Sequence, residues 1–174
     1  TDLLRQEIAA TAEIVVIKVG PRVLTQADGT LHTSRMEQLA EQLSALAAED
    51  KKVVLVSSGA VGAGMSQLGL DQRPENLSTL QAVAAVGQTH LIQTYDQTFS
   101  RHGQKAAQVL LTAQELNDRT SYLNVRNTLL SLLSLNVIPI INENDTVSVD
   151  ELLTTFGDND RLAALVTNLL GASL

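Results

Sequence analysis

Short runs of β-branched residues alternate along this chain with longer stretches of helical periodicity, and this alternation most constrains its fold. Apolar runs typical of buried strands occur at 13–20, at the start of 52–69, at 106–111 and at the start of 136–147. Strands that alternate with helices usually pair in parallel and carry helices on both faces of the sheet. The sequence therefore predicts an α/β fold, with a mostly parallel sheet between two helical layers.

Apolar residues recur at helical spacing in the segments between these runs. Ser34 with Glu37 matches a capping box, which predicts a helix from Ser34 to Asp50. Further helices are expected at about 78–102, at 118–136 and from about 160 to 170, and Gly171 is placed to end the last of them.

Two local signals qualify this pattern. Asp28-Gly29 is a turn signal that predicts a small hairpin. Pro139 lies inside the run "NVIPII" and weakens the prediction of a strand there, because proline cannot donate a hydrogen bond to a neighbouring strand.

The composition excludes several classes of function. A chain of 174 residues is the size of one domain or of a large part of one. It contains no cysteine, which excludes disulfides and thiolate metal sites, and this fits the cytoplasm. The net charge of -7 and the near absence of aromatic residues argue against a nucleic-acid or membrane surface. The first residues show no secretory signal pattern.

A glycine-rich turn follows the second run, in "VVLVSSGAVGAGMSQLG" (53–69). Its spacing is not that of a dinucleotide fingerprint, and Met65 stands where a Walker loop has lysine. Backbone amides at the start of the following helix suit a carboxylate or phosphoryl oxygen, and Ser57 or Ser58 offers a hydroxyl. The alternative is a tight strand-to-helix crossover whose small residues serve packing alone.

Polar residues follow the other predicted strands and are expected to share one edge of the sheet. Lys18 lies inside the first run, close to Gly20 at its end; it is either a phosphate-binding cation or a solvated side chain. Asn142 to Asp145 follow the fourth run, and Gly157 to Asp160 precede the last helix. Asparagine and aspartate also make turns and helix caps, although amide and carboxylate together can bind an ammonium group.

The three histidines, His32, His90 and His102, lie on different predicted elements without ligand spacing, so no histidine metal site is expected. No G-x-S-x-G elbow and no cysteine nucleophile is present either. Covalent acyl chemistry therefore has no support in this sequence.

Taken in order, six motifs resemble the glutamate 5-kinases of the amino acid kinase family. They are "IKVG", "VVLVSSGAVGAGM", "LQAVAAVGQ", "YLNVRNTL", "PIINENDTV" and "FGDNDRLAALV". The resemblance covers residues 14–174, and it implies a three-layer αβα fold. It divides the chain into an extension, residues 1–12, and the amino-terminal, amino-acid-binding part of a kinase domain, residues 13–174.

The resemblance implies that ATP phosphorylates the side-chain carboxylate of L-glutamate to γ-glutamyl phosphate, the first step toward proline. It also implies Mg²⁺ as cofactor, proline as feedback inhibitor, a homo-oligomer, and γ-glutamyl phosphate reductase as pathway partner. The roles that it implies fall on ten residues: Lys18 and Asp160 as catalytic groups; Ser58, Gly59, Ala60, Asn142, Asp145, Asp158 and Asn159 at the glutamate; and Lys18 with Gly20 at the nucleotide.

Two departures from the family pattern leave alternatives open. Pro21 stands where relatives carry serine or threonine, which removes a hydroxyl and an amide donor near the ATP phosphates. Family kinase domains also continue past the position of Leu174 with a second phosphate-binding lysine and the adenine pocket. A non-catalytic fragment that binds glutamate or proline is therefore the alternative function.

Overall fold

A single parallel sheet forms the centre of the molecule, seen here in a computed structural model that describes residues 2–26, 28–148 and 158–174. Within these ranges the sheet has four strands in the order β1, β2, β4 and β3. Their bounds are Ile14–Lys18 for β1, Lys52–Val56 for β2, Lys105–Leu111 for β3 and Val137–Glu143 for β4. The predicted α/β fold with a parallel sheet is confirmed.

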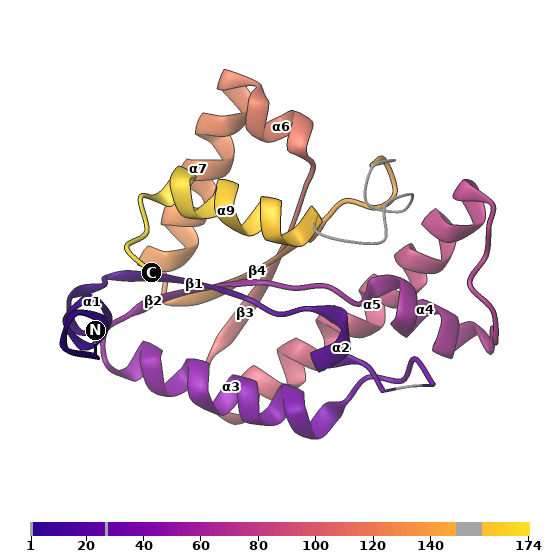
Figure 1. Ribbon diagram of the computed structural model, residues 1–174, viewed down its shortest axis with the longest axis horizontal. Helices are drawn as coiled ribbons and strands as arrows, with labels where there is room; N and C mark the ends of the chain where they lie inside the picture. The colour runs from indigo at the N-terminus through magenta and orange to yellow at the C-terminus, as the bar shows by residue number, and fades with distance from the viewer. Residues whose placement is uncertain (1, 27, 149–157) are drawn as a thin grey trace.

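Helices cover both faces of this sheet (Figure 1). Helices α3 (Thr33–Ala48) and α5 (Leu77–Arg101) lie on one face, and α7 (Arg119–Ser134) and α9 (Asp158–Leu170) lie on the other. Successive side chains of β2 enter the two cores in turn: Val53 and Leu55 join the first, and Val54 and Val56 join the second. A strand buried on both faces must be apolar throughout, which explains its unbroken run of valine and leucine.

Pro139 lies inside β4, which is a central strand, so the doubt that it raised about this strand was wrong. The carbonyl of Ile141 accepts from Ser57 N (2.8 Å) and thus faces β2. Residues two apart face the same side of a strand, so Pro139 also faces β2. Pairing between β2 and β4 begins only at Leu55 and Ile140, so the missing N–H of Pro139 leaves no ladder bond broken.

Helices α4 (Ala60–Leu68) and α5 pack at backbone contact through two glycines. A Cβ added to Gly64 would lie 1.9 Å from the carbonyl oxygen of Val83, and one added to Gly87 would lie 1.8 Å from that of Ala60. Only glycine allows so close an approach. The packing role considered for the glycine-rich turn therefore holds for Gly64.

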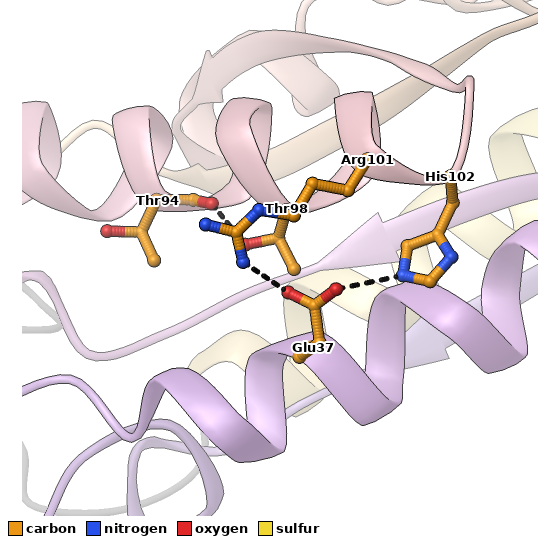
Figure 2. Close-up of polar contacts among 5 residues, drawn as sticks. All are labelled: Glu37, Thr94, Thr98, Arg101 and His102. Carbon is orange, nitrogen blue, oxygen red and sulfur yellow. Dashed lines mark hydrogen bonds and ion pairs between the residues drawn. The ribbon is translucent and has the colours of Figure 1, made fainter.

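The capping box predicted at Ser34 and Glu37 is wrong. Helix α3 begins at Thr33, and its N-cap residue, His32, makes no side-chain cap. Glu37 instead binds the end of α5, through Arg101 Nη1 (2.9 Å) and His102 Nε2 (3.1 Å), as Figure 2 shows. The same view shows Thr98 Oγ1 donating to the carbonyl of Thr94 within α5. Glu37 thus ties the two helices of one layer together.

Three further helices lie outside the predicted pattern: α1 (Asp2–Thr11), α2 (Pro21–Leu24) and α6 (Ala113–Asn117). Pro21 opens α2 at its first position, where a missing N–H costs nothing. A capping box formed by Thr112 and Glu115 starts α6. Lys51 Nζ binds the carbonyls of Ala10 and Ala12 at 2.7 Å each, which holds the end of α1.

The remaining turns follow the sequence signals. Asp28 Oδ1 accepts from the backbone N (3.0 Å) and from the hydroxyl (2.6 Å) of Thr30, in a turn closed by a single antiparallel bridge between Thr25 and Leu31. Gly171 ends α9 with φ 64°. Beyond it, the carbonyl of Leu174 accepts from Val16 N (2.8 Å), which places the last residue alongside β1.

Substituting one glycine of the α4–α5 contact tests this packing. Gly64→Ala places a methyl group against the Val83 backbone, so we expect a loss of about 2–4 kcal/mol in the free energy of unfolding. Gly62→Ala is the matched control on the same helix, because the nearest atoms to its Cβ belong to the Thr25 side chain, at 3.5 Å and beyond. It should be neutral or stabilising by up to about 1 kcal/mol. Urea titration measures both, and equal stabilities of the two variants would refute the contact.

Candidate functional site

Polar side chains from four elements meet at the carboxyl ends of the strands. Lys18 ends β1, Ser57 and Ser58 follow β2, Asn142 belongs to the end of β4, and Asn159 and Asp160 lie in the first turn of α9. Hydrogen bonds and an ion pair join these residues into two adjacent groups, one around Asn159 and one around Asp160. The prediction that they share one edge of the sheet is confirmed.

Asn159 is the centre of the buried group, with only 4% of its surface exposed. Its Nδ2 donates to the carbonyl of Ser57 (2.9 Å), to Ser58 Oγ, and more weakly to Asn142 Oδ1 (3.3 Å). Its Oδ1 is buried and has no hydrogen-bond partner among the described residues. An unsatisfied buried acceptor is costly, so this oxygen is suited to a donor on a ligand.

Ser58 is placed to act as a donor. Its Oγ accepts from Asn159, which leaves its own proton available for another acceptor. Ser57, by contrast, is fully buried, and its Oγ lies 3.0 Å from the hydroxyl of Tyr95 on α5. Of the two hydroxyls considered at this turn, Ser58 is therefore the one at the polar site.

The turn itself has the backbone of an anion-binding helix start. Gly59 adopts a left-handed conformation (φ 102°) and is the N-cap of α4, without a side-chain cap. Ala60 is the first residue of the helix and is buried. The amides of this first turn have no partner within the helix. Gly59 thus shapes the turn, whereas Gly64 serves the packing.

Lys18 and Asp160 form the second group. Lys18 Nζ lies 2.8 Å from Asp160 Oδ1, with the two side chains 31% and 69% exposed. A Cβ on Gly20 would lie 3.5 Å from the same Nζ, so the ammonium rests beside this glycine. An exposed ion pair adds little to stability. A competing anion can therefore replace Asp160 beside Lys18 at little cost. Lys18 is therefore an exposed residue that is also paired with Asp160, which leaves both alternatives for this residue open.

Asp145 lies just beyond β4, in a turn that starts at Asn144. Burial, together with the nearby Glu143 carboxylate, raises the pKa of Asp145 to about 6, against an opposing effect of Arg73. Within the described part of the chain, no hydrogen bond joins Asp145 to Asn159. A carboxylate that is costly to ionise favours a cationic partner.

Two predicted positions fall wholly or partly outside the described residues. Gly157 lies outside them, and of Asp158 only the backbone, at the start of α9, is described. Of the side chains that the structure does describe, no three His, Asp or Glu residues gather in a way that could hold a metal ion. No helix in those ranges is long and apolar enough to cross a membrane.

The model of the amino acid kinase family matches residues 13–174. The chain belongs to this family. It is 52% identical over 166 residues to the glutamate 5-kinase of Rhodopirellula baltica, an alignment that covers 95% of the chain and 43% of the relative. The glutamate 5-kinase of Azoarcus sp. is 51% identical over 161 residues, which are 92% of the chain and 43% of the relative. The glutamate 5-kinase of Thioalkalivibrio sulfidiphilus is 54% identical over 159 residues, which are 91% of the chain and 42% of the relative. This amino acid kinase chain thus spans less than half of the curated relatives it matches.

Sequence reasoning missed two residues that support the site from α5. Gln88 accepts from Asn142 Nδ2 (2.8 Å), and Tyr95 contacts Ser57. The signal was present, since Gln88 falls between Ala84 and Leu91 on the apolar face of the helix. A lone polar residue on a buried helical face needs a partner.

Replacing Asp145 tests its environment. Because folding raises its pKa, the stabilising contribution of the protonated carboxyl is complete below pH about 4 and is lost as the pH rises through about 6. Asp145→Asn keeps no titrating group. We expect it to gain up to about 3 kcal/mol of unfolding free energy relative to the unmodified protein between pH 4 and pH 7. Urea titrations at several pH values measure this difference, and a constant difference would contradict the raised pKa.

Asp118 provides the control for the sign. The backbone N–H of Ser121 lowers the pKa of Asp118, the N-cap of α7. Its contribution to stability is present above the pKa of the unfolded chain and is lost as the pH falls. As the pH rises, Asp118→Asn should therefore lose unfolding free energy relative to the unmodified protein, whereas Asp145→Asn should gain it.

Proposed function

We propose that the protein containing this chain transfers a phosphoryl group from ATP to the side-chain carboxylate of L-glutamate. The chain supplies the site of the amino acid and part of the phosphoryl site. One observation carries the proposal: the buried amide of Asn159, held by Ser58 and Asn142, lies next in sequence to the accessible ion pair of Asp160 and Lys18. The names of the 51–54% identical relatives support it.

The chemistry of the reaction fits these groups. A glutamate side chain, with a pKa of about 4.3, is ionised at neutral pH and needs no general base. The protein must hold two anions together and stabilise the charge on the transferred phosphoryl group. Lys18 supplies the cation, and Asp160 orients it. Ser58 and the amides after Gly59 supply donors for a carboxylate.

The ammonium group of glutamate requires acceptors. Asn159 Oδ1 is buried without a partner among the described residues, and Asp145 supplies a carboxylate with a raised pKa. A neutral and a charged oxygen are both acceptors that suit an ammonium group. We therefore assign these two residues to the amino group of the substrate.

Mg²⁺ is expected to accompany ATP. This ion keeps several waters and binds one or two carboxylates together with substrate phosphates, so it does not require a cluster of three acidic residues. Asp160, 69% exposed, offers one such carboxylate. When bound, the ion neutralises charge on the phosphate oxygens. Inhibition by proline, an oligomeric state and the reductase partner stay predictions.

Trapping the acyl phosphate with hydroxylamine tests the reaction. We expect the full-length protein, given ATP, Mg²⁺ and L-glutamate, to yield hydroxamate, and Lys18→Ala to lower kcat by about 100-fold or more. Lys52→Ala is the matched control, because Lys52 pairs in register with Ile14 at the other end of the sheet and should keep the activity. Equal rates in the two variants, or no hydroxamate from the unmodified protein, would reject the proposal.

The assigned role of Asp145 predicts a pH dependence of substrate binding. Only the ionised carboxylate attracts the ammonium group, so the KM for L-glutamate should fall as the pH rises through about 6. Asp145→Asn should raise the KM and remove this pH dependence. Steady-state kinetics from pH 5 to pH 8 measures it, and an unchanged profile in the variant would assign the titration to another group.

A further inference from the structure

We propose that Gln88, on α5, is a positioning residue for the amino acid acceptor. It holds the Asn142 amide, and through it Asn159, in the orientation that leaves Asn159 Oδ1 free for the ammonium group of the substrate. The inference rests on the proposed function, because it concerns how the same site selects an amino acid over a simple dicarboxylic acid.

Two backbone groups fix the direction of the amide chain. The N–H of Glu143 donates to Asn142 Oδ1 (2.9 Å), and a backbone N–H can only donate. The carbonyl of Ser57 accepts from Asn159 Nδ2 (2.9 Å), and a carbonyl can only accept. These two contacts identify which atom of each side-chain amide is the oxygen and which is the nitrogen. Asn142 Nδ2 is turned toward α5, and Asn159 Oδ1 is the acceptor that remains.

Gln88 supplies the acceptor that this orientation requires. Its Oε1 accepts from Asn142 Nδ2 at 2.8 Å, in a buried contact between residues 54 apart in sequence. Asn142 is 2% exposed and Gln88 is 9% exposed, so water does not readily replace either partner. Without Gln88 the Nδ2 group would be buried and unsatisfied, and the side chain would rotate to find another acceptor.

The helix that carries Gln88 is itself fixed against the glycine-rich turn. Gly87, its neighbour, contacts the backbone of Ala60 and Gly64 so closely that no side chain fits. Two turns further along α5, Tyr95 contacts the hydroxyl of Ser57. Gln88 is therefore held in register with both Ser57 and Asn142, and it can position the amide chain instead of following it.

The consequence for specificity follows from the free oxygen of Asn159. That oxygen can accept from the ammonium group of glutamate, whereas glutarate has no group to donate to it. When Asn142 rotates, Asn159 loses its contact with Asn142 Oδ1 and keeps those with Ser57 and Ser58, so its oxygen is held less firmly toward the ligand. Loss of Gln88 should therefore weaken the binding of L-glutamate more than that of glutarate. It should leave the binding of the nucleotide largely unchanged.

The test compares Gln88→Met with Gln88→Glu in the full-length protein. Methionine has a similar length and offers no strong acceptor, so we expect the KM for L-glutamate to rise roughly 10-fold with little change in the KM for ATP. The ratio of kcat/KM for L-glutamate to that for glutarate should fall by a similar factor. The carboxylate of the Gln88→Glu variant still accepts from Asn142 Nδ2. We therefore expect this variant to retain a substrate ratio within about 3-fold of that of the unmodified protein.

Gln97→Met, an exposed glutamine on the same helix, is the matched control and should change neither constant. Thermal unfolding of each variant separates loss of folding from loss of positioning. A Gln88→Met variant with a lower melting temperature but an unchanged substrate ratio and KM for L-glutamate would show that Gln88 has a structural role alone. If the unmodified protein yields no hydroxamate, the proposed function fails and this inference, which rests on it, fails with it. An unchanged ratio in an active, folded Gln88→Met variant overturns the inference alone.

Discussion

The backbone contact between α4 and α5 is the constraint on which the polar site depends. Gly64 and Gly87 remove the side chains that would separate the two helices, and the first turn of α4 is thereby fixed against the middle of α5. The turn after β2 must then lie where α5 can reach it. A displacement of α5 by the width of one methyl group would disturb its contacts with both Ser57 and Asn142.

The two halves of the site differ in their exposure to water, and the difference suits their tasks. The amide group around Asn159 is buried, where each hydrogen bond depends on a fixed partner. The pair formed by Lys18 and Asp160 lies nearer to the solvent, where a charged ligand can replace one partner at little cost. Under the proposed function, the buried amides would serve selection of the acceptor together with Asp145, and the accessible pair would serve charge stabilisation.

Much of this arrangement could be predicted from sequence, because parallel strands bring their carboxyl ends to one edge. That rule placed Lys18, Ser58, Asn142 and Asn159 together without any coordinates. Local signals were less dependable. Ser34 and Glu37 have the spacing of a capping box, yet Glu37 is used by Arg101 and His102, residues more than sixty positions away. Gln88 escaped prediction for a similar reason, since its partner lies on a distant strand and only the folded chain brings them together.

Pro139 lies where the backbone pairing between β2 and β4 stops. Because β2 and β4 pair only at Leu55–Ile140 and Val56–Ile141, their backbones are joined near the polar site and not at the opposite end. There the contact between Lys52 Nζ and Asn136 Oδ1 (2.9 Å) is a side-chain bridge in place of a ladder. Each amino end stays paired with its other neighbour, β2 with β1 and β4 with β3, so the gap lies between these two strands alone. The sheet is therefore continuous across its four described strands only at the edge that carries the polar site, where neighbouring strands are held at a fixed spacing.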